Sequence, residues 1–254
     1  MSRMVLVLVA LGVLCASLPN GWTAESSEQQ MAIAKIEKIG GKVTVDDKIA
    51  GKPVVGVDFC GVKATDADLA SVAGLTSLES LNLSDTKVTD AGLANLKRLT
   101  KLRSLGLLHV AVTDSGLKHL QGLTNLESLT LAGTKVTGAG LAHLQGLSKL
   151  AVLDLRAVPV TDADLKHLQA LKKLRKLSLW DTKVTDAGLD ELSRLTALEW
   201  LDLELTEVTS GGIASLKSLT SLRELNLSNT MVSRGAAGDI AGALPNAKVT
   251  CRYF

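Results

Sequence analysis

Aromatic residues and excess charge are both scarce in this chain. Phe, Trp and Tyr make up 2% of its residues, and the formal net charge at pH 7 is only +2. Proteins that bind nucleic acid usually carry a surplus of positive charge, and those that bind single strands also stack bases on aromatic rings. The composition therefore argues against a nucleic-acid partner, and it supplies no field that would hold the chain on an anionic membrane.

The sequence also lacks an apolar run of transmembrane length. The longest run, Met4–Leu18, is about fifteen residues, whereas a membrane span needs about twenty. Because it follows a short basic start, it has the arrangement of a secretory signal. We predict that residues 1–24 are a signal peptide, cleaved after Ala24, which exports the chain to the periplasm or the extracellular space. Earlier cleavage, after Ala16 or Ser17, and retention as an uncleaved anchor both stay open.

The sequence does contain a regular repeat. A unit of 24 residues occurs seven times between Thr65 and Val232 without insertion or deletion. Its pattern is T-D-A-G-L-x-x-L-x-x-L-x-x-L-x-x-L-x-L-x-x-T-x-V, and the second copy reads TDAGLANLKRLTKLRSLGLLHVAV. A fixed period in the twenties predicts a solenoid, in which each unit buries its apolar side only against its neighbours.

Each unit combines the signals of a strand and a short helix. The alternation of Leu81, Asn82 and Leu83 has the period of two expected of a strand with one buried face. The half that begins with Thr89 and Asp90 favours a helix start, because Thr caps free N–H groups and Asp complements the helix dipole. We therefore predict an α/β fold of right-handed coils, a curved horseshoe with a parallel sheet on its concave face and short helices on its convex face.

The segments that flank the repeats depart from the unit. Residues 25–30 are polar, and we predict a flexible lead-in there. Residues 31–64 are predicted to form an N-terminal cap, residues 65–232 the seven repeats, and residues 233–254 a partial repeat with a C-terminal cap. Caps are needed because a terminal coil otherwise exposes an apolar face.

The motif Leu-x-x-Leu-x-Leu-x-x-Thr-x-Val occurs as LESLNLSDTKV at 78–88 and as LRKLSLWDTKV at 174–184. It resembles the leucine-rich repeat family. The VTDAGL half of the unit is similar to exported bacterial repeat proteins of the short-helix type and to the cysteine-containing subclass of F-box proteins. The family usually closes each coil with Asn, where this chain has Thr or, in two copies, Val. We expect looser turns at Val110 and Val158, because valine has no hydroxyl to cap a turn.

Strand alternation indicates which residues of each unit lie on the concave face. They are small in the first three units, whereas the next three carry both tryptophans that follow the signal segment. Trp and Arg dominate the energy of many interfaces, so we predict a binding surface here, with Arg156 close enough to Trp180 for a cation–π contact. In the alternative interpretation the indoles are tolerated surface aromatics that pack on neighbouring side chains. The predicted residues are Trp180, Trp200, Arg156, Lys176, Asp154, Asp202 and Glu204.

A further column of residues, just before each strand, alternates in charge and should form weak cross-strand ion pairs. We interpret it as a solvated face without a ligand. Its members are Glu79, Arg103, Glu127, Ala151, Arg175, Glu199 and Arg223.

Two columns on the helical side raise the question of metal binding. His119, His143 and His167 recur at one helix position, and aligned imidazoles can bind zinc or copper. No Cys or carboxylate recurs beside them, so duplication of the unit explains their alignment, and helix capping explains the recurring aspartates. Motifs of hydrolases, phosphate-binding loops and zinc proteases are missing from the sequence. We predict no metal, no cofactor and no catalytic residue.

Two cysteines follow the signal segment, Cys60 and Cys251. They lie near opposite ends of the repeats, about eight strands or 35–40 Å apart at about 4.8 Å a strand. A disulfide requires Cα atoms within about 7 Å, so the two cannot pair in one molecule. Pairing of either one with another molecule stays open.

These observations predict an exported, non-catalytic monomer that binds another protein through its concave face. A second hypothesis is a structural component of the cell envelope that binds peptidoglycan or another glycan, since Trp beside carboxylates can stack on sugars. A third, a substrate-recognition arm like that of F-box ligase adaptors, follows from the resemblance alone and conflicts with the signal segment.

Overall fold

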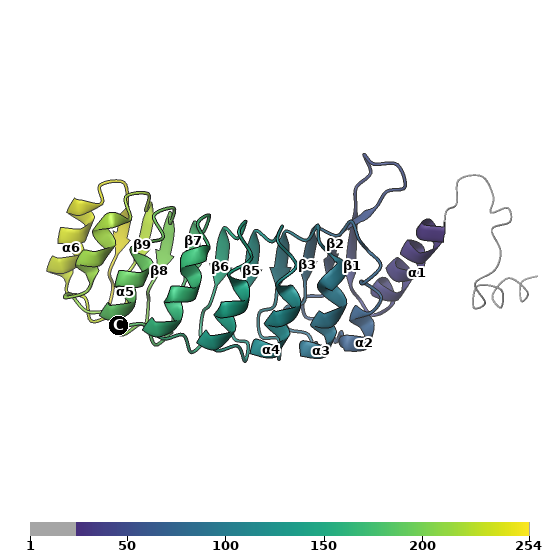
Figure 1. Ribbon diagram of the computed structural model, residues 1–254, viewed down its shortest axis with the longest axis horizontal. Helices are drawn as coiled ribbons and strands as arrows, with labels where there is room; N and C mark the ends of the chain where they lie inside the picture. The colour runs from purple at the N-terminus through teal and green to yellow at the C-terminus, as the bar shows by residue number, and fades with distance from the viewer. Residues whose placement is uncertain (1–23, 254) are drawn as a thin grey trace, which may run out of the picture.

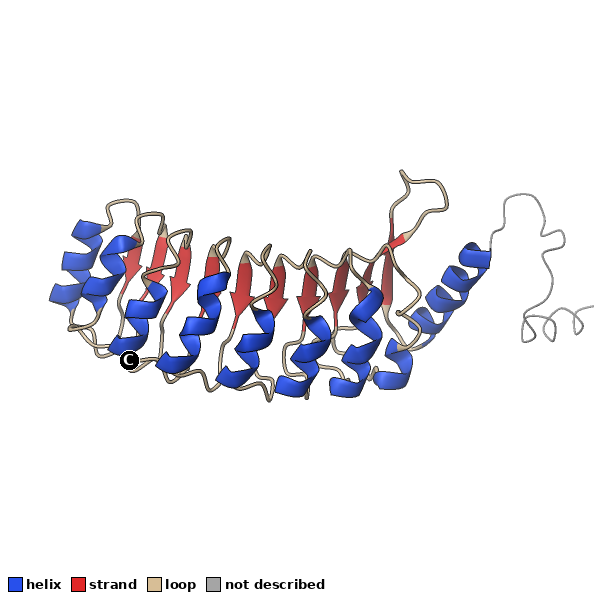
Figure 2. Cartoon of the chain, viewed as in Figure 1, coloured by secondary structure: helices blue, strands red, loops and turns tan. Residues whose placement is uncertain are grey.

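A computed structural model describes residues 24–253, so the predicted signal peptide lies outside the described residues except for Ala24. The described chain is one elongated row of coils (Figure 1), with strands along one side and helices along the other (Figure 2). Ten strands form one sheet in sequence order. The first pair, β1 and β2, is antiparallel, and the remaining neighbours are parallel. The predicted α/β solenoid is confirmed.

The strands of the repeats are short and equally spaced. Two longer strands at the N-terminal end form a hairpin, and β10 adds a last rung after the repeats. Their bounds are β1 Lys42–Val45, β2 Val54–Asp58, β3 Ser80–Asn82, β4 Ser104–Gly106, β5 Ser128–Thr130, β6 Val152–Asp154, β7 Lys176–Ser178, β8 Trp200–Asp202, β9 Glu224–Asn226 and β10 Lys248–Thr250.

The convex side carries short α-helices and 3₁₀ helices. The α-helices are α1 Ala24–Lys38, α2 Asp66–Leu69, α3 Asp90–Leu93, α4 Asp114–Leu117, α5 Asp186–Leu192 and α6 Arg234–Ala243. The 3₁₀ helices are Ala94–Arg98, Lys118–Leu120, Gly138–Leu144, Asp162–Ala170 and Ile213–Ser218.

The flexible lead-in expected at residues 25–30 is instead the first part of α1. This part is tied to the β1–β2 hairpin by Gln29, whose Oε1 accepts from the Val54 N–H at 3.0 Å and whose Nε2 donates to the Lys52 carbonyl at 3.1 Å. A polar sequence can still be helical when its side chains find such partners.

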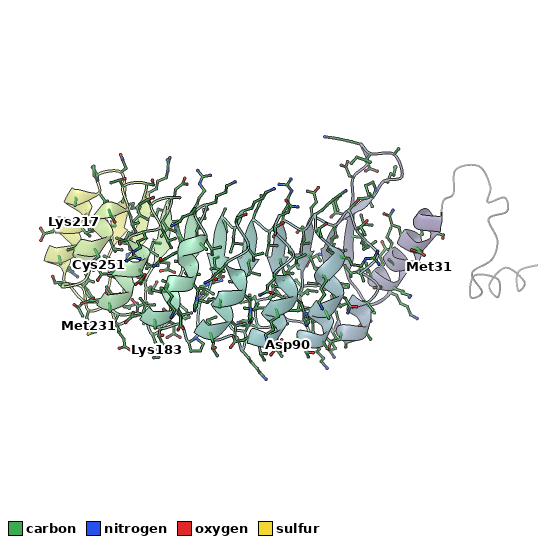
Figure 3. The ribbon with its side chains drawn as sticks, viewed as in Figure 1. Met31, Asp90, Lys183, Lys217, Met231 and Cys251 are labelled. Atoms are coloured by element: carbon green, nitrogen blue, oxygen red, sulfur yellow. The ribbon has the colours of Figure 1, made fainter. Side chains whose placement is uncertain are left out.

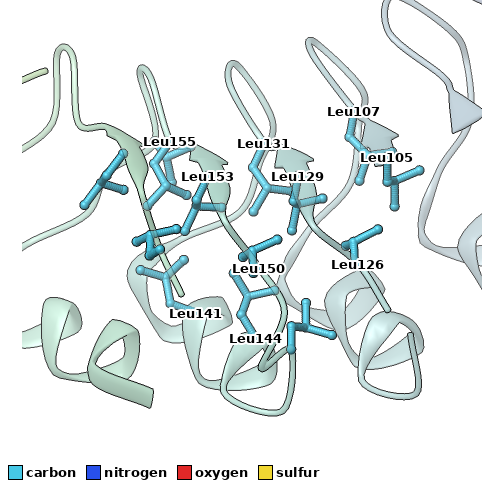
Figure 4. Close-up of a cluster of buried hydrophobic side chains, with 14 of the residues drawn as sticks. Leu105, Leu107, Leu126, Leu129, Leu131, Leu141, Leu144, Leu150, Leu153 and Leu155 are labelled. Atoms are coloured by element: carbon cyan, nitrogen blue, oxygen red, sulfur yellow. The ribbon is translucent and has the colours of Figure 1, made fainter. Parts of the chain in front are cut away.

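Leucine side chains fill the space between sheet and helices along the whole row, and Figure 4 shows part of this core, from Leu105 to Leu155. The middle residue of each repeat strand points inward, so that Leu105, Leu129 and Leu153 are each at most 1% exposed. Burying one leucine contributes about 1.5–3 kcal/mol. Because each leucine contacts the coils on both sides, no coil has a core of its own.

An aspartate also joins one coil to the next through two hydrogen bonds. Asp66 Oδ1 accepts from the Thr89 N–H at 2.7 Å, and its Oδ2 accepts from Thr89 Oγ1 at 2.7 Å. We call this pair of bonds the aspartate staple. The helix-capping interpretation of these aspartates is therefore incomplete. The staple recurs in Asp90–Thr113, Asp114–Thr137, Asp162–Thr185 and Asp186–Thr209.

The staple explains the glycine of the T-D-A-G-L motif. A Cβ added to Gly92 would lie 2.3 Å from Asp66 Oδ1, and the same distance separates a Cβ on Gly116 from Asp90 Oδ1. No side chain fits there while the preceding aspartate holds its threonine. The glycine of one coil is thus required by the aspartate of the coil before it.

Two junctions of the repeats lack the aspartate staple. At the last one Ser210 replaces the aspartate, and its Oγ accepts from the Ser233 N–H at 2.9 Å. At the other junction, Gly138 stands where five of the seven repeats have the aspartate, and Asp164 stands where the next unit would have the glycine. Asp164 Oδ2 accepts from the N–H and the Oγ1 of Thr161, in its own coil, at 2.9 and 2.7 Å. A Cβ on Gly138 would lie 1.9 Å from that carboxylate, so the two solutions exclude each other.

The expectation of looser turns at Val110 and Val158 is wrong. Both valines are at most 1% exposed, and the residue before each, His109 or Ala157, has φ of 56° or 55°, as Asp85 does at 57° in a threonine turn. The Val110 and Val158 N–H groups close their turns on backbone carbonyls at 3.1 Å. The same backbone bond closes the threonine turns at Thr134 and Thr206, at 3.2 Å, so loss of the hydroxyl does not loosen the turn.

We expect Gly138→Asp alone to destabilise the protein by about 1–3 kcal/mol, because the new carboxylate collides with Asp164. Adding Asp164→Gly should recover most of this loss, since it clears the space and allows a regular staple to Thr161. Urea unfolding midpoints of the wild type, both single variants and the double variant measure the coupling. Additive effects of the two substitutions would refute the exclusion.

Candidate binding surface on the concave face

Strand register fixes two rows of side chains on the concave face. Lys176, Trp200 and Glu224 are register partners in one row, and Ser178, Asp202 and Asn226 in the other. The other predicted residues of the concave face lie beyond the strand ends, in the turns that follow the strands. These residues are Arg156, Trp180 and Glu204. Their positions are set by the turn that follows each strand and not by the alternation of side chains along the strand.

Trp200 stands between two open hollows of the concave face. The first, of about 420 Å³, lies on its N-terminal side and is lined by Thr130, Val152, Leu153, Asp154, Arg156, Lys176, Ser178, Trp200 and Asp202. The second, of about 520 Å³, lies on its C-terminal side and is lined by Trp200, Glu204, Glu224, Asn226, Ser228, Asn229, Thr250, Arg252 and Tyr253. The half-buried indole forms the wall shared by both.

Six of the seven predicted residues line these hollows. The first hollow brings together Asp154, Arg156, Lys176, Trp200 and Asp202. Glu204 lines the second hollow. Trp180 lines neither and is half-buried in the turn after β7.

Sequence reasoning missed the far wall of the second hollow. Arg252 and Tyr253 reach it because β10 adds one rung after the last repeat. The sequence signal for β10 was weak, since residues 248–250 do not carry the leucine pattern of the repeat strands.

Arg156 is neutralised by a neighbour in its own coil. Its Nε and Nη2 donate to the two carboxylate oxygens of Asp154 at 2.9 and 2.8 Å, and this bonding raises the pKa of the guanidinium above its ordinary value. The predicted cation–π contact of Arg156 with Trp180 is not found: within residues 24–253 the cation–π contact is that of Arg234 with Tyr253, at 6.0 Å. The two-oxygen contact with Asp154 is the stronger one.

Asp202 is the most buried acid of the surface, at 7% exposed. Ser178 Oγ donates to its Oδ2 at 3.1 Å, and Asn226 Nδ2 donates to its Oδ1 at 2.9 Å. Burial raises the pKa of the Asp202 carboxyl, and these hydrogen bonds only partly offset that effect. Glu204 also accepts from Asn226, at 2.9 Å, so the two acids share one amide.

Lys176 is the exposed cation of the first hollow. Unlike Arg156, it forms no ion pair with any other residue in the described part of the chain. Its ammonium is therefore available to a ligand that carries negative charge.

The histidine column on the helical side is held by glutamines. Gln121 Nε2 lies 3.0 Å from His143 Nδ1, and Gln145 Nε2 lies 3.0 Å from His167 Nδ1. Among residues 24–253, no three His, Cys, Asp or Glu side chains converge as metal ligands would. The same stretch contains no helix that is both long and apolar enough to cross a membrane.

Comparison with known proteins gives a repeat family and a structural relative. A family profile for the leucine-rich repeat matches residues 74–97. Internalin C2 of Listeria monocytogenes strain 4b F2365 is similar in structure, with a TM-score of 0.67 and 25% sequence identity, over 93% of this chain and all of that one. No curated protein matches the sequence.

Replacing Asp202 with Asn should increase stability, and the gain should grow with pH. Because the pKa of Asp202 is raised on folding, the native state holds its proton to higher pH than the unfolded state does. Wild-type stability therefore falls as pH rises above about 3.9, the unfolded value, while the variant lacks this loss. The difference between the two urea midpoints, measured from pH 3 to 7, should rise and then level off; a constant difference would contradict the assignment.

Proposed function

Because this chain is a leucine-rich-repeat protein, we propose that it is an exported, non-catalytic binding protein that holds another protein on its concave face. The observation that carries this proposal is the position of Trp200 between two hollows. An indole shared by two adjacent depressions can be covered from both sides, and such enclosed aromatic residues dominate interface energies.

The electrostatics of the surface agree with a protein partner. Asp154 and Arg156 satisfy each other, and Asp202 and Glu204 are held by amides. Satisfied polar groups fix the shape of the surface and need little desolvation of unpaired charge on binding. Lys176 then provides an available positive charge on one side of the indole, and Glu224 an exposed acid on the other, which suits orientation of a partner more than bulk attraction.

A glycan partner is the second candidate function. Asp154 lines the first hollow and Glu204 the second, with Trp200 between them, and an aromatic ring flanked by carboxylates can stack on a sugar and bind its hydroxyls. A structural role in the cell envelope, bound to peptidoglycan, would use this same surface.

Export rests on the apolar N-terminal segment. Cleavage after Ala24 would leave α1 almost whole, together with the Gln29 contacts that fasten it to the hairpin. The exported chain would therefore keep its N-terminal cap. The adaptor hypothesis has no comparable support in residues 24–253.

Trp200→Ala should weaken capture of the partner by about 30-fold or more, because a central indole typically contributes about 2 kcal/mol or more to an interface. Trp180→Ala added to it should abolish capture. The measurement is affinity capture from the exported fraction with identification by mass spectrometry, then titration of the captured partner. A glycan-array signal that shifts Trp fluorescence, and that Trp200→Ala removes, would favour the glycan candidate instead.

The matched control removes two exposed apolar side chains elsewhere. Met31 and Met231 are 51% and 62% exposed (labelled in Figure 3), so Met31→Ala with Met231→Ala should leave capture intact. Circular dichroism should be unchanged in all variants. Full capture by the doubly substituted tryptophan variant would reject this surface.

The mature chain should begin at Glu25 if the signal is cleaved as predicted. Intact-mass measurement of the protein recovered outside the cytoplasm tests this directly. A mass that includes residues 1–24 would show an uncleaved anchor, and a start at Ser17 or Leu18 would show the earlier site.

A further inference from the structure

The amino edge of the sheet, where the strands begin, carries the column of alternating charges. Arg103 contacts two acids, with Nη1 2.6 Å from Glu127 Oε1 and Nε 3.6 Å from Glu79 Oε2. Further along, Arg175 Nη2 lies 2.5 Å from Glu199 Oε1. Each of these three acids is already engaged by an arginine.

The column has a gap at Ala151. Every other unit has a charged side chain at this position, whereas between Glu127 and Arg175 the alanine brings neither charge nor bulk. Ala197, two coils further along in the neighbouring column, is equally small. A hollow of about 420 Å³ opens between them, and its remaining lining is Glu127, Arg175, Lys149, Lys172 and Lys173.

The lysines around this gap lack charged partners. Lys149 Nζ donates to Asn125 Oδ1 at 2.7 Å, a neutral group, and within residues 24–253 neither Lys172 nor Lys173 forms an ion pair. The repeat shows that Lys172 is exceptional, because every other unit has an uncharged hydroxyl residue at its position. Those residues are Thr76, Thr100, Thr124, Ser148, Thr196 and Thr220.

From this placement we infer that the hollow at Ala151, lined by Lys149, Lys172 and Lys173, is a binding site for a phosphoryl or sulfate group. Each ammonium offers three donors and no acceptor, and lysine binds such oxyanions as a point charge. The one acid in the lining, Glu127, is paired with Arg103, so the three ammonium groups leave the depression with a surplus of positive charge that matches a compact dianion. The site lies on the sheet edge and is independent of the concave surface around Trp200.

The decisive variant places an acid in the hollow. Ala151→Glu would fill the gap and place a carboxylate between Arg175 and the lysines, so it should abolish binding of dextran sulfate to the full chain. Ala151→Ser adds little volume and no charge, and it should bind like the wild type. Binding is measured by calorimetry over a range of salt concentrations, with uncharged dextran as the blank.

A lysine pair with a matched control tests the same site. Lys172→Ala with Lys173→Ala should weaken binding by at least about tenfold and flatten its dependence on salt, since fewer counterions are displaced. Lys135→Ala with Lys183→Ala makes the same change in net charge at the opposite edge of the sheet, where Lys183 is labelled in Figure 3, and should have little effect. If both double variants lost the same amount of binding, the interaction would depend on net charge alone, and this result would overturn the site.

Inorganic phosphate and sulfate distinguish the source of the group. Competition by either ion alone indicates a free ion, whereas resistance indicates an anion presented on a polymer; both results uphold the site if Ala151→Glu blocks binding. Unchanged binding by Ala151→Glu would reject it. Trp200→Ala should bind dextran sulfate normally, so failure of the concave-face proposal and failure of this one are separable.

Discussion

The aspartate staple is the constraint on which the regularity of this solenoid depends. Through Asp66 and Thr89 it sets the spacing of the convex side, as strand pairing does on the concave side. The same carboxylate forbids a side chain at Gly92. Three positions of the motif, in two coils, are therefore one unit of interaction, and a change at one position is tolerated only with a change at another. The exchange of Gly138 and Asp164 is such a coupled change.

Because of this coupling, the residues of each coil fall into two groups: those that hold the backbone conformation and those that are free to vary. The leucines, the staple and the turn with a positive φ before each threonine hold the backbone in one conformation. This turn is kept even where Val110 replaces threonine. Residues on the concave face and the amino edge do not take part in those contacts. They can therefore vary without cost to the fold, and the two surfaces proposed for binding consist of such residues, Trp200 on the face and Lys172 at the edge.

Much of the fold follows from the sequence, and the reasons for the misses are physical. Period and alternation place Trp200 and Asp202 correctly, because register in a parallel ladder is fixed by the buried leucines. Side-chain pairing is not so fixed: Arg156 can reach its neighbours in several rotamers, and its choice of Asp154 depends on geometry that spacing does not encode. The start of α1 was missed because its support comes from Gln29 contacts with a distant hairpin.

A repeat also gives an internal reference against which each side chain can be judged. Lys172 is ordinary as a surface lysine, yet it is exceptional among six hydroxyl residues at the same position. Ala151 is ordinary as an alanine, yet it interrupts a column of charges. Neither departure from the repeat pattern changes the buried core of its coil, so the stability of the fold does not explain why these residues differ. Departures that also meet at a hollow, as these do, are better explained by a ligand than by drift, because independent drift has no reason to place added charge and removed bulk together.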